Sequence, residues 1–270
     1  MNSTTDTSRG AIWLAALTGH ATPLGDYPPS VRVVDAPLAE STARYIAVLP
    51  DPDNRFTRAR TGEIGLVEGW QLARAVQQVV EADHDQPVKR PIVAVIDVAS
   101  QAYGRREEAY GIHQALAGAA GAYAEARLAG HPVIGLIVGK AMSGAFLAHG
   151  YQANRLIAFD DPQVMVHAMG KVSAARITLR TVEALEALAA TIPPMAYDIG
   201  NYASLGLLWR TLTVARPDAP SQDDVAQVAA SLRAALADIR LDPERGLASR
   251  LGAPHRQASA RVREVLEQQW

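Results

Sequence analysis

The chain has 270 residues, of which 49% are hydrophobic and 20% are charged, and its formal net charge is −2. This balance is typical of a packed soluble protein, and it gives no electrostatic footprint for nucleic acid or for an anionic membrane surface. The sequence contains no cysteine, which excludes disulfide bonds, thiolate metal sites and a cysteine nucleophile.

The N-terminal segment is polar, and we expect the tip of residues 1–9 to be disordered. Residues 11–17 are apolar but too few to span a bilayer, and no long cationic segment precedes them. They predict a short amphipathic helix within an N-terminal extension over residues 1–30. No other segment reaches the length of a membrane span, so we expect a cytoplasmic protein.

Strand and helix signals alternate along the rest of the chain. Continuous apolar runs predict buried strands, and apolar residues three or four apart predict helices. Such an alternation indicates an α/β protein whose central strands are covered on both faces. In chain order, the expected elements are strands at 31–34 and 44–49, a helix at 66–82, a strand at 91–98, a helix at 107–128, a strand at 133–138, a short helix from 145, strands at 155–159 and 164–166, helices at 172–180 and 182–191, a strand at 211–214, and helices at 224–239 and 258–270.

The most informative segment comprises residues 132–150. A buried strand at 133–138 is followed by a predicted small-residue turn at 139–144 and then by a short apolar helix. A strand that ends in glycines at the start of a helix offers free backbone N–H groups, which can bind an anion or an oxyanion. No side chain here is an obvious acid, base or metal ligand, so main-chain donors would carry most of the chemistry.

Residues 97–108 repeat this arrangement, because an apolar strand again stops at a small-residue loop before a helix. Glu107 and Glu108 fall in the first turn of that helix, where carboxylates interact favourably with its positive end. Tyr103 precedes Gly104, which places an aromatic ring beside a flexible backbone position. This is expected where main chain comes close to a ligand, although an ordinary turn explains the glycine equally well.

Residues 97–108, 139–150 and 201–208, with the strand that follows them, resemble the crotonase-like superfamily and, within it, the α half of acyl-CoA carboxyltransferases. The closer resemblance is to the γ subunits of biotin-independent malonate decarboxylases, and it covers most of residues 32–213. The segments that carry it occur together in a specific order: residues 45–56, 100–108, 138–153, 166–171 and 193–198. It implies a spiral of β-β-α units over residues 31–215, followed by a helical C-terminal extension over residues 216–270.

The resemblance also implies an activity. Members of the family decarboxylate malonyl-S-acyl carrier protein to acetyl-S-acyl carrier protein and CO₂, within a hetero-oligomer of a β subunit, a γ subunit and an acyl carrier protein subunit. Loss of CO₂ leaves negative charge on the thioester oxygen as an enolate, which needs preorganised donors in a dry pocket. The backbone N–H groups of Gly144, Tyr103 and Gly104 suit that task, at a site shared with the β subunit.

The resemblance implies no tightly bound cofactor. The substrate thioester would be carried on the CoA-like prosthetic group of the carrier protein, and biotin would not be needed. In agreement, the chain has no Ala-Met-Lys-Met motif for biotin attachment. No metal is expected either, because the loop with Asp51 and Asp53 lacks the further ligands of a calcium site.

Ser143 and His167 are the side chains with the most distinctive alternatives. Ser143 begins the short helix, so it is either an N-cap or, as in Clp-type proteases, a nucleophile that needs a histidine within reach. The sequence does not place His113, His149 or His167 relative to it. His167 is either a buried core histidine or part of the acyl pocket, where it could give a proton to the enolate carbon. Tyr103 either packs or contacts substrate.

Candidate substrate-binding residues flank these positions. Gly139, Lys140 and Met142 belong to the predicted turn, and Arg105 and Arg106 follow the other loop. Either arginine could bind the phosphate of a pantetheine-type arm, or both are solvated surface charges. We assign no arginine to the malonate carboxylate, because a firm ion pair there would stabilise the ground state and hinder loss of CO₂.

Three alternatives to the decarboxylase remain open. The first is a carboxyltransferase α subunit of a biotin-dependent complex. The second is a scaffold that completes the β subunit's site and docks the carrier protein without a catalytic donor of its own. The third is a Clp-like peptidase with Ser143 as its nucleophile.

Overall fold

The computed structural model describes residues 7–242 and 244–270. Its centre is one seven-stranded sheet in the order β1-β2-β3-β4-β5-β7, with β6 paired to β4. The pair β1–β2 is antiparallel, and all other pairs are parallel. The strands are β1 (Val31–Leu38), β2 (Ser41–Val48), β3 (Ile92–Val98), β4 (Val133–Met142), β5 (Arg155–Phe159), β6 (Met165–His167) and β7 (Arg210–Leu212).

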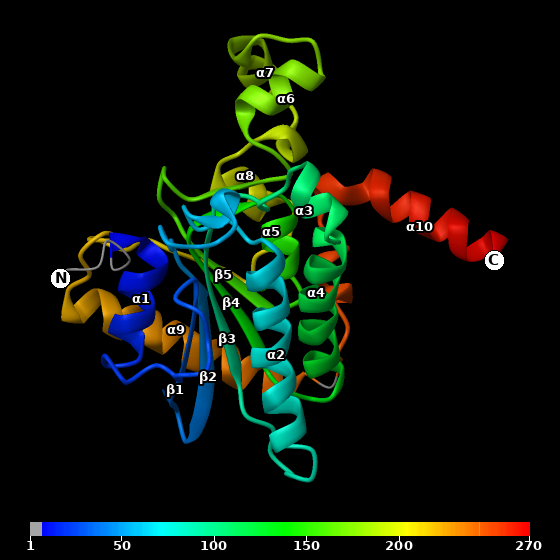
Figure 1. Cartoon of the computed structure of the whole chain (residues 1–270). Coiled ribbons are helices and arrows are strands. Elements are labelled where there is room, and N and C mark those ends of the chain that lie inside the picture. The colour runs from blue at the N-terminus through cyan, green and yellow to red at the C-terminus, as the bar shows by residue number, and fades with distance from the viewer. Residues whose placement is uncertain (1–6, 243) are drawn as a thin grey trace.

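Helices cover both faces of the sheet. Figure 1 shows α2 and α4 side by side on one face and α1 and α9 on the other. The predicted α/β class is therefore confirmed. The helices are α1 (Arg9–Leu17), α2 (Leu66–Ala82), α3 (Arg105–Ala109), α4 (Ile112–Leu128), α5 (Ser143–Ala148), α6 (Lys171–Ile177), α7 (Val182–Ala189), α8 (Ile199–Ser204), α9 (Gln222–Leu241) and α10 (Gln257–Gln269), with 3₁₀ turns at Thr57–Ala59, Pro193–Met195, Ala248–Arg250 and Pro254–Arg256.

The core lies between the central strands and these helices. The side chains of Ile92, Val95 and Ile137 are fully buried, as expected for parallel strands with helices on both faces. On one face, α2 and α4 approach closely at Gly69, where a Cβ atom would come within 2.8 Å of the Ala115 backbone. Glycine is needed here for space, so that the helix pair can lie flat on the sheet.

Side chains of the N-terminal helix α1 bind residues that are far away in the sequence. The Arg9 guanidinium donates to Asp218 at 2.7 Å and to Asp161 at 2.9 Å. Trp13 is fully buried, and its indole N–H donates to the Pro217 carbonyl at 2.8 Å. These contacts make α1 part of the core. The expected disorder at the tip concerns residues 1–6, which lie outside the described residues.

Two predicted elements are wrong in their extent. The strand β4 does not end before a turn at 139–144 but continues to Met142, because Lys140, Ala141 and Met142 pair with β6. Gly139 lies within this strand, where a side chain would collide with the Asp97 carboxylate. The predicted helix at 107–128 is two helices, α3 and α4, because Gly111 between them has left-handed backbone with φ +81°. The other predicted elements are confirmed with end shifts of at most three residues, except that β1 continues four residues beyond the predicted strand at 31–34.

Two parts project from the body in Figure 1. The pair α6 and α7 stands above the sheet, and α10 extends away from the side. The hairpin exposes Val172, Ile177 and Leu179. No residue of α10 is buried, and its exposed apolar side chains Val262 and Leu266 lie one turn apart. Both parts therefore expose apolar side chains that other described residues do not fully cover.

A buried histidine follows α5 and joins two layers of the fold. The Nε2 atom of His149 lies 3.1 Å from the Val95 carbonyl, and Nδ1 lies 3.0 Å from the Tyr123 hydroxyl. Because a carbonyl can only accept, Nε2 carries the hydrogen and Nδ1 accepts from Tyr123. Burial lowers the pKa of His149 from its ordinary value of 6.5 to about 4.

This shift predicts a loss of stability in mild acid. Between about pH 6.5 and pH 4 the unfolded chain binds a proton at His149 that the folded chain excludes, so the free energy of unfolding falls as the pH falls. Urea unfolding at several pH values should show a slope about 1.4 kcal/mol per pH unit steeper for the wild type than for His149→Gln. The exposed His113, changed to Gln, serves as the control. Equal slopes for wild type and His149→Gln would contradict the assignment.

Candidate active site

A hollow of about 480 Å³ opens beside the junction of β4 and α5. Its walls are mostly apolar, and they come from α5, from the end of β6 and from the segments that flank α8. Three of the five predicted catalytic residues, Ser143, Gly144 and His167, line it together. Apolar neighbours in the lining include Phe146, Leu147, Val166, Leu205 and Leu207.

The backbone at the β4–α5 junction is strained. Ser143 has φ +58°, a left-handed conformation that costs a non-glycine residue about 1–2 kcal/mol. The residue before the helix is Met142, and no side chain caps the helix there. The N-cap interpretation of Ser143 is therefore wrong. The strained turn instead takes the chain directly from a buried strand into α5 beside the hollow.

The loop after β3 reaches this junction through one side chain. The Gly144 N–H donates to Oε1 of Gln101 at 2.8 Å. The Tyr103 N–H donates to the Gln101 carbonyl at 3.0 Å. Two of the three predicted backbone donors thus have internal acceptors, whereas the Gly104 N–H has none among the described residues. The two loops adjoin as predicted, but the contact between them runs through the side chain of Gln101, which was not among the predicted site residues.

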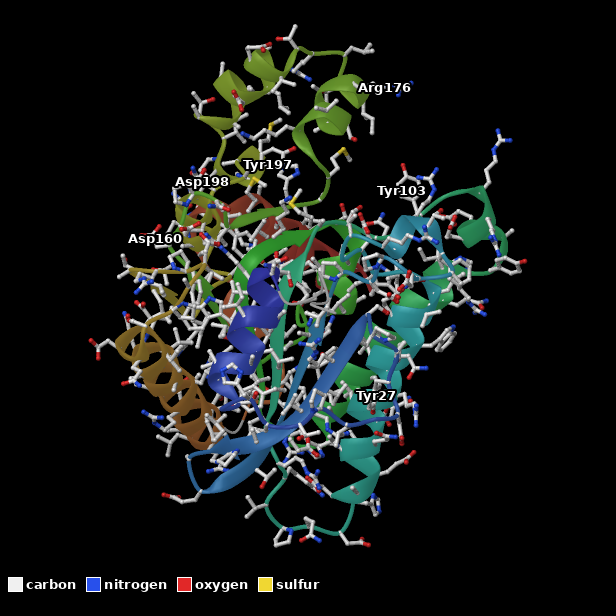
Figure 2. The ribbon with its side chains drawn as sticks, turned by 60° about the vertical axis from the view of Figure 1, so that its left-hand side comes forward. Tyr27, Tyr103, Asp160, Arg176, Tyr197 and Asp198 are labelled. Carbon is white, nitrogen blue, oxygen red and sulfur yellow. The ribbon has the colours of Figure 1, made fainter. Side chains whose placement is uncertain are left out.

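Tyr103, Gly104, Arg105 and Arg106 do not line the hollow. Tyr103 is 59% exposed, and Figure 2 shows it across the top of the molecule from Tyr197, which lies near the base of the α6–α7 hairpin. Gly104 is tightly enclosed, since a Cβ atom would lie 2.6 Å from Nε of Arg58. These residues form a separate surface next to the hollow.

His167 is held in place by an aromatic stack. Its ring lies parallel to that of Tyr197, with centroids 3.9 Å apart. Its Nδ1 atom contacts the Met169 carbonyl at 3.0 Å, and the Tyr197 hydroxyl donates to the same carbonyl at 2.8 Å. Burial lowers the pKa of His167, so a neutral imidazole faces the hollow at neutral pH.

The three remaining predicted residues lie next to the hollow but do not line it. Gly139 is packed against Asp97, and the Lys140 N–H donates to Oδ1 of Asp97 at 3.1 Å, while its side chain is exposed. Met142 is buried in a small apolar cluster below the hairpin with Tyr197. Each position has a structural explanation that does not require a ligand.

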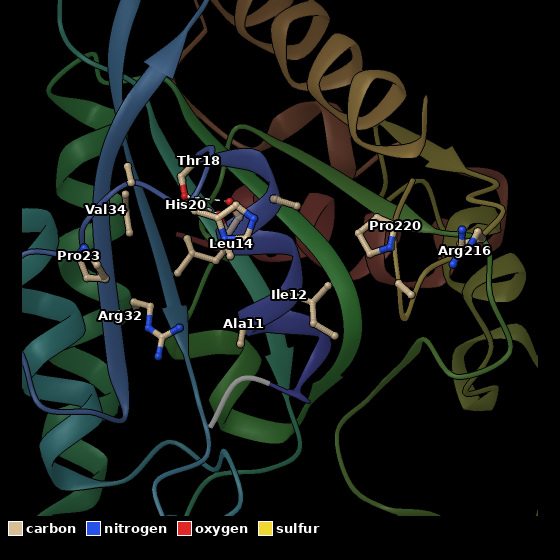
Figure 3. A pocket seen from close by; sticks show the side chains of 14 residues that line it. Ala11, Ile12, Leu14, Thr18, His20, Pro23, Arg32, Val34, Arg216 and Pro220 are labelled. Atoms are coloured by element: carbon tan, nitrogen blue, oxygen red, sulfur yellow. Dashed lines mark hydrogen bonds between the residues drawn. The ribbon is translucent and has the colours of Figure 1, made fainter. Parts of the chain in front are cut away.

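Other parts of the described chain give weaker indications of a functional site. A hollow of about 660 Å³ lies between α1, β1 and residues 216–220 (Figure 3), with Leu14, Arg32 and Arg216 in its walls, and it contains none of the predicted site residues. His, Asp and Glu side chains within the described ranges form no group that could hold a metal ion. No helix among the described residues has both the length and the apolar character needed to cross a membrane.

Residues 59–270 match the family model of the malonate decarboxylase gamma subunit. The chain belongs to this family. A crystal structure of a Pseudomonas malonate decarboxylase hetero-tetramer in complex with coenzyme A contains a similar chain, with 65% identity, a TM-score of 0.93, and coverage of 97% of this chain and 100% of that chain. A Pseudomonas MdcD–MdcE hetero-dimer contains another, with 63% identity, a TM-score of 0.90 and the same coverage. The predicted family is confirmed.

More distant matches give information on the fold and on the length of this chain relative to other proteins. The malonyl-S-ACP:biotin-protein carboxyltransferase MADD of Malonomonas rubra is 38% identical over 157 residues, which are 57% of this chain and 54% of that protein. This chain thus spans about half the length of that relative. The transcarboxylase 12S core matches with a TM-score of 0.64 at 19% identity, over 86% of this chain and 42% of that chain. This match supports the predicted carboxyltransferase-type, crotonase-like fold alone.

The surroundings of Ser143 predict that its hydroxyl is dispensable for turnover. Within the described chain no histidine is hydrogen-bonded to it, and both ring nitrogens of His149 have other partners. Ser143→Ala in the assembled complex should keep kcat within about threefold of wild type. Ser143→Gly should raise the free energy of unfolding by about 1 kcal/mol, because glycine relieves the left-handed strain. A hundredfold loss of kcat in both variants would instead support a nucleophile.

Proposed function

We propose that this chain is the γ subunit of a malonate decarboxylase that converts malonyl-S-acyl carrier protein to acetyl-S-acyl carrier protein and CO₂. The observation that carries this proposal is the apolar hollow at the β4–α5 junction, where Gly144 and His167 meet beside the loop after β3. In a chain of the malonate decarboxylase γ family, this is the place suited to a malonyl thioester.

The lining of the hollow suits decarboxylation. The bond between the carboxylate carbon and the α carbon breaks, its electron pair moves into the thioester as an enolate, and CO₂ leaves. An apolar wall does not hold the carboxylate in place, whereas it accommodates neutral CO₂. The enolate carbon then takes up a proton to give the acetyl group, and His167 on the wall is a candidate donor for it once its neutral ring has bound a proton from solvent.

The proposed complex includes a β subunit, since the solved relatives are described as hetero-dimers and hetero-tetramers. The projecting α6–α7 hairpin and α10 support an assembly, because both expose apolar side chains that a partner would cover. We place the malonyl thioester between the hollow of this chain and the β subunit.

A second candidate function differs from the decarboxylase in its requirement for biotin. The relative from Malonomonas rubra is named as a biotin-protein carboxyltransferase, which favours a carboxyltransferase α subunit as that candidate. The decarboxylase proposed here needs no biotin, since the carboxyl group leaves as CO₂ and is not transferred.

The complex purified with its β subunit and carrier protein should therefore release CO₂ from the malonyl thioester of the carrier and not from free malonate. Avidin, which sequesters biotin, should leave this rate unchanged. A rate that avidin abolishes would favour the carboxyltransferase, and a complex that releases no CO₂ from the thioester would contradict the proposed reaction.

A cluster of exposed arginines lies beside the loop after β3, and we name it the arginine patch: Arg55, Arg58, Arg60, Arg105 and Arg106. No member forms an ion pair within the described chain. Arg55 and Arg106 lie over the ring of Phe56 at 4.8 and 5.3 Å, which fixes both guanidinium groups at the surface. We propose that the patch receives the carrier protein and the phosphate of its acyl arm.

Charge reversal tests this role. Arg106→Glu and Arg55→Glu should each raise KM for the carrier-bound substrate about tenfold at low salt, with a smaller effect at high salt because ions screen the attraction. KM for a malonyl thioester of free pantetheine should change much less. Arg216→Glu, an equal charge change at the distant α1 face of Figure 3, serves as the control. Equal effects on both substrates would contradict carrier docking.

A further inference from the structure

The orientation of the Gln101 side-chain amide is fixed by its partner. The atom 2.8 Å from the Gly144 N–H accepts a hydrogen bond, so it is the oxygen Oε1 and not the nitrogen. This single bond decides which end of the amide is which. The amino group Nε2, with its two hydrogens, therefore lies at the other end of the amide, away from Gly144.

The backbone that carries this side chain is held firmly. The Gln101 carbonyl accepts from the Tyr103 N–H and from the Ser100 hydroxyl, both at 3.0 Å. On either side of Gln101, the Ala102 N–H donates to the Ile64 carbonyl at 2.8 Å and the Ile64 N–H to the Ser100 carbonyl at 3.0 Å. The amide is thus fixed at both its backbone and its oxygen, and little entropy is lost when Nε2 meets a ligand.

The amino group of Gln101 is unpaired and accessible. Among the described residues, no acceptor lies within hydrogen-bond distance of Nε2. The buried side-chain polar atoms that lack a partner in that part of the chain are Nε2 of His131 and Oη of Tyr202. Because Nε2 of Gln101 is not one of them, this atom has some exposure to solvent. Gln101 does not itself line the hollow, and its link to the hollow is the bond from the N–H of Gly144, which does line it, to Oε1.

We propose that Gln101 is the side-chain donor to the thioester oxygen, and that the Gly144 N–H is the group that positions it. This inference rests on the proposed function. When the bond to the carboxylate carbon breaks, its electron pair forms the enolate, and the charge that develops on the thioester oxygen is stabilised by Nε2–H of Gln101. CO₂ leaves, and the α carbon takes up one proton.

In a rival arrangement, the Gly144 N–H is the donor to the thioester oxygen and Gln101 is not. In that arrangement Gln101 merely occupies the Gly144 N–H, and the thioester oxygen displaces Oε1 to reach the backbone donor. The two arrangements predict different results when an apolar residue of similar size replaces Gln101. Removal of the amide destroys the donor in the first case and uncovers the Gly144 N–H in the second.

Two nearly isosteric variants of the assembled complex separate these arrangements. Gln101→Glu keeps an oxygen for the Gly144 N–H and loses the amino donor, whereas Gln101→Met loses both. Loss of one such donor costs about 10²–10³-fold in rate, so both variants should lower kcat on the malonyl thioester by that factor. KM should change less than about threefold, because the interaction forms mainly in the transition state. Gln227→Glu, the same change on the exposed part of α9, is the matched control.

Size-exclusion chromatography with the β subunit and thermal unfolding show whether each variant still folds and assembles. A kcat within tenfold of wild type for either well-assembled variant overturns the role of Gln101, and a faster Gln101→Met identifies the rival arrangement. If the wild-type complex itself releases no CO₂ from the thioester, the proposed function fails, and this inference fails with it. An active wild type with active variants rejects the inference alone.

Discussion

The parallel pairing of β3 with β4 is the constraint from which the site follows. Because the two strands run in the same direction, their carboxyl ends meet at one edge of the sheet, and the loops that leave them adjoin. The register shifts near Asp97, whose carboxylate accepts the N–H groups of Gly10 and Lys140. This carboxylate ties α1, β3 and β4 together directly below the site. The contact between Gly144 and Gln101 therefore lies where the sheet brings the two strand ends together.

Charge is separated from the hollow. No residue that lines the hollow carries a charged side chain, since His167 is held neutral by burial, while the arginine patch lies outside on the neighbouring surface. For the proposed reaction this division has a clear physical sense. Cations on the neighbouring surface would attract the anionic phosphate of the acyl arm without touching the carboxylate that must be lost, and the dry interior favours the departure of neutral CO₂.

Local patterns in the sequence predict most elements but not their long-range partners. The helix at 66–82 has the observed bounds of α2, because its period and its ends are local signals. The extent of β4 depends on its pairing with β6, which no local pattern shows. Gly139 in addition resembles the glycine of a turn, although it lies within the strand. Ser143, Gly144 and His167 share one hollow, whereas Tyr103 and Arg106 face a separate surface. No local sequence pattern marks Gln101 as a site residue, because only its contact with Gly144 in the folded chain shows where its side chain lies.

The hollow and the projecting hairpin depend on each other. Pro193 and Pro194, which follow α7, line the hollow, and the His167–Tyr197 stack stands at the base of the hairpin. The inner side of the hairpin packs on Met142 and Tyr197, whereas its outer side is uncovered, since Leu179 is 95% exposed with left-handed backbone. A partner that buries this apolar surface would also fix the wall that carries His167. In the proposed complex, a β subunit that covers the apolar side chains of the hairpin would therefore also support the wall that carries His167, whereas the sheet of this chain alone brings Gly144 and Gln101 together.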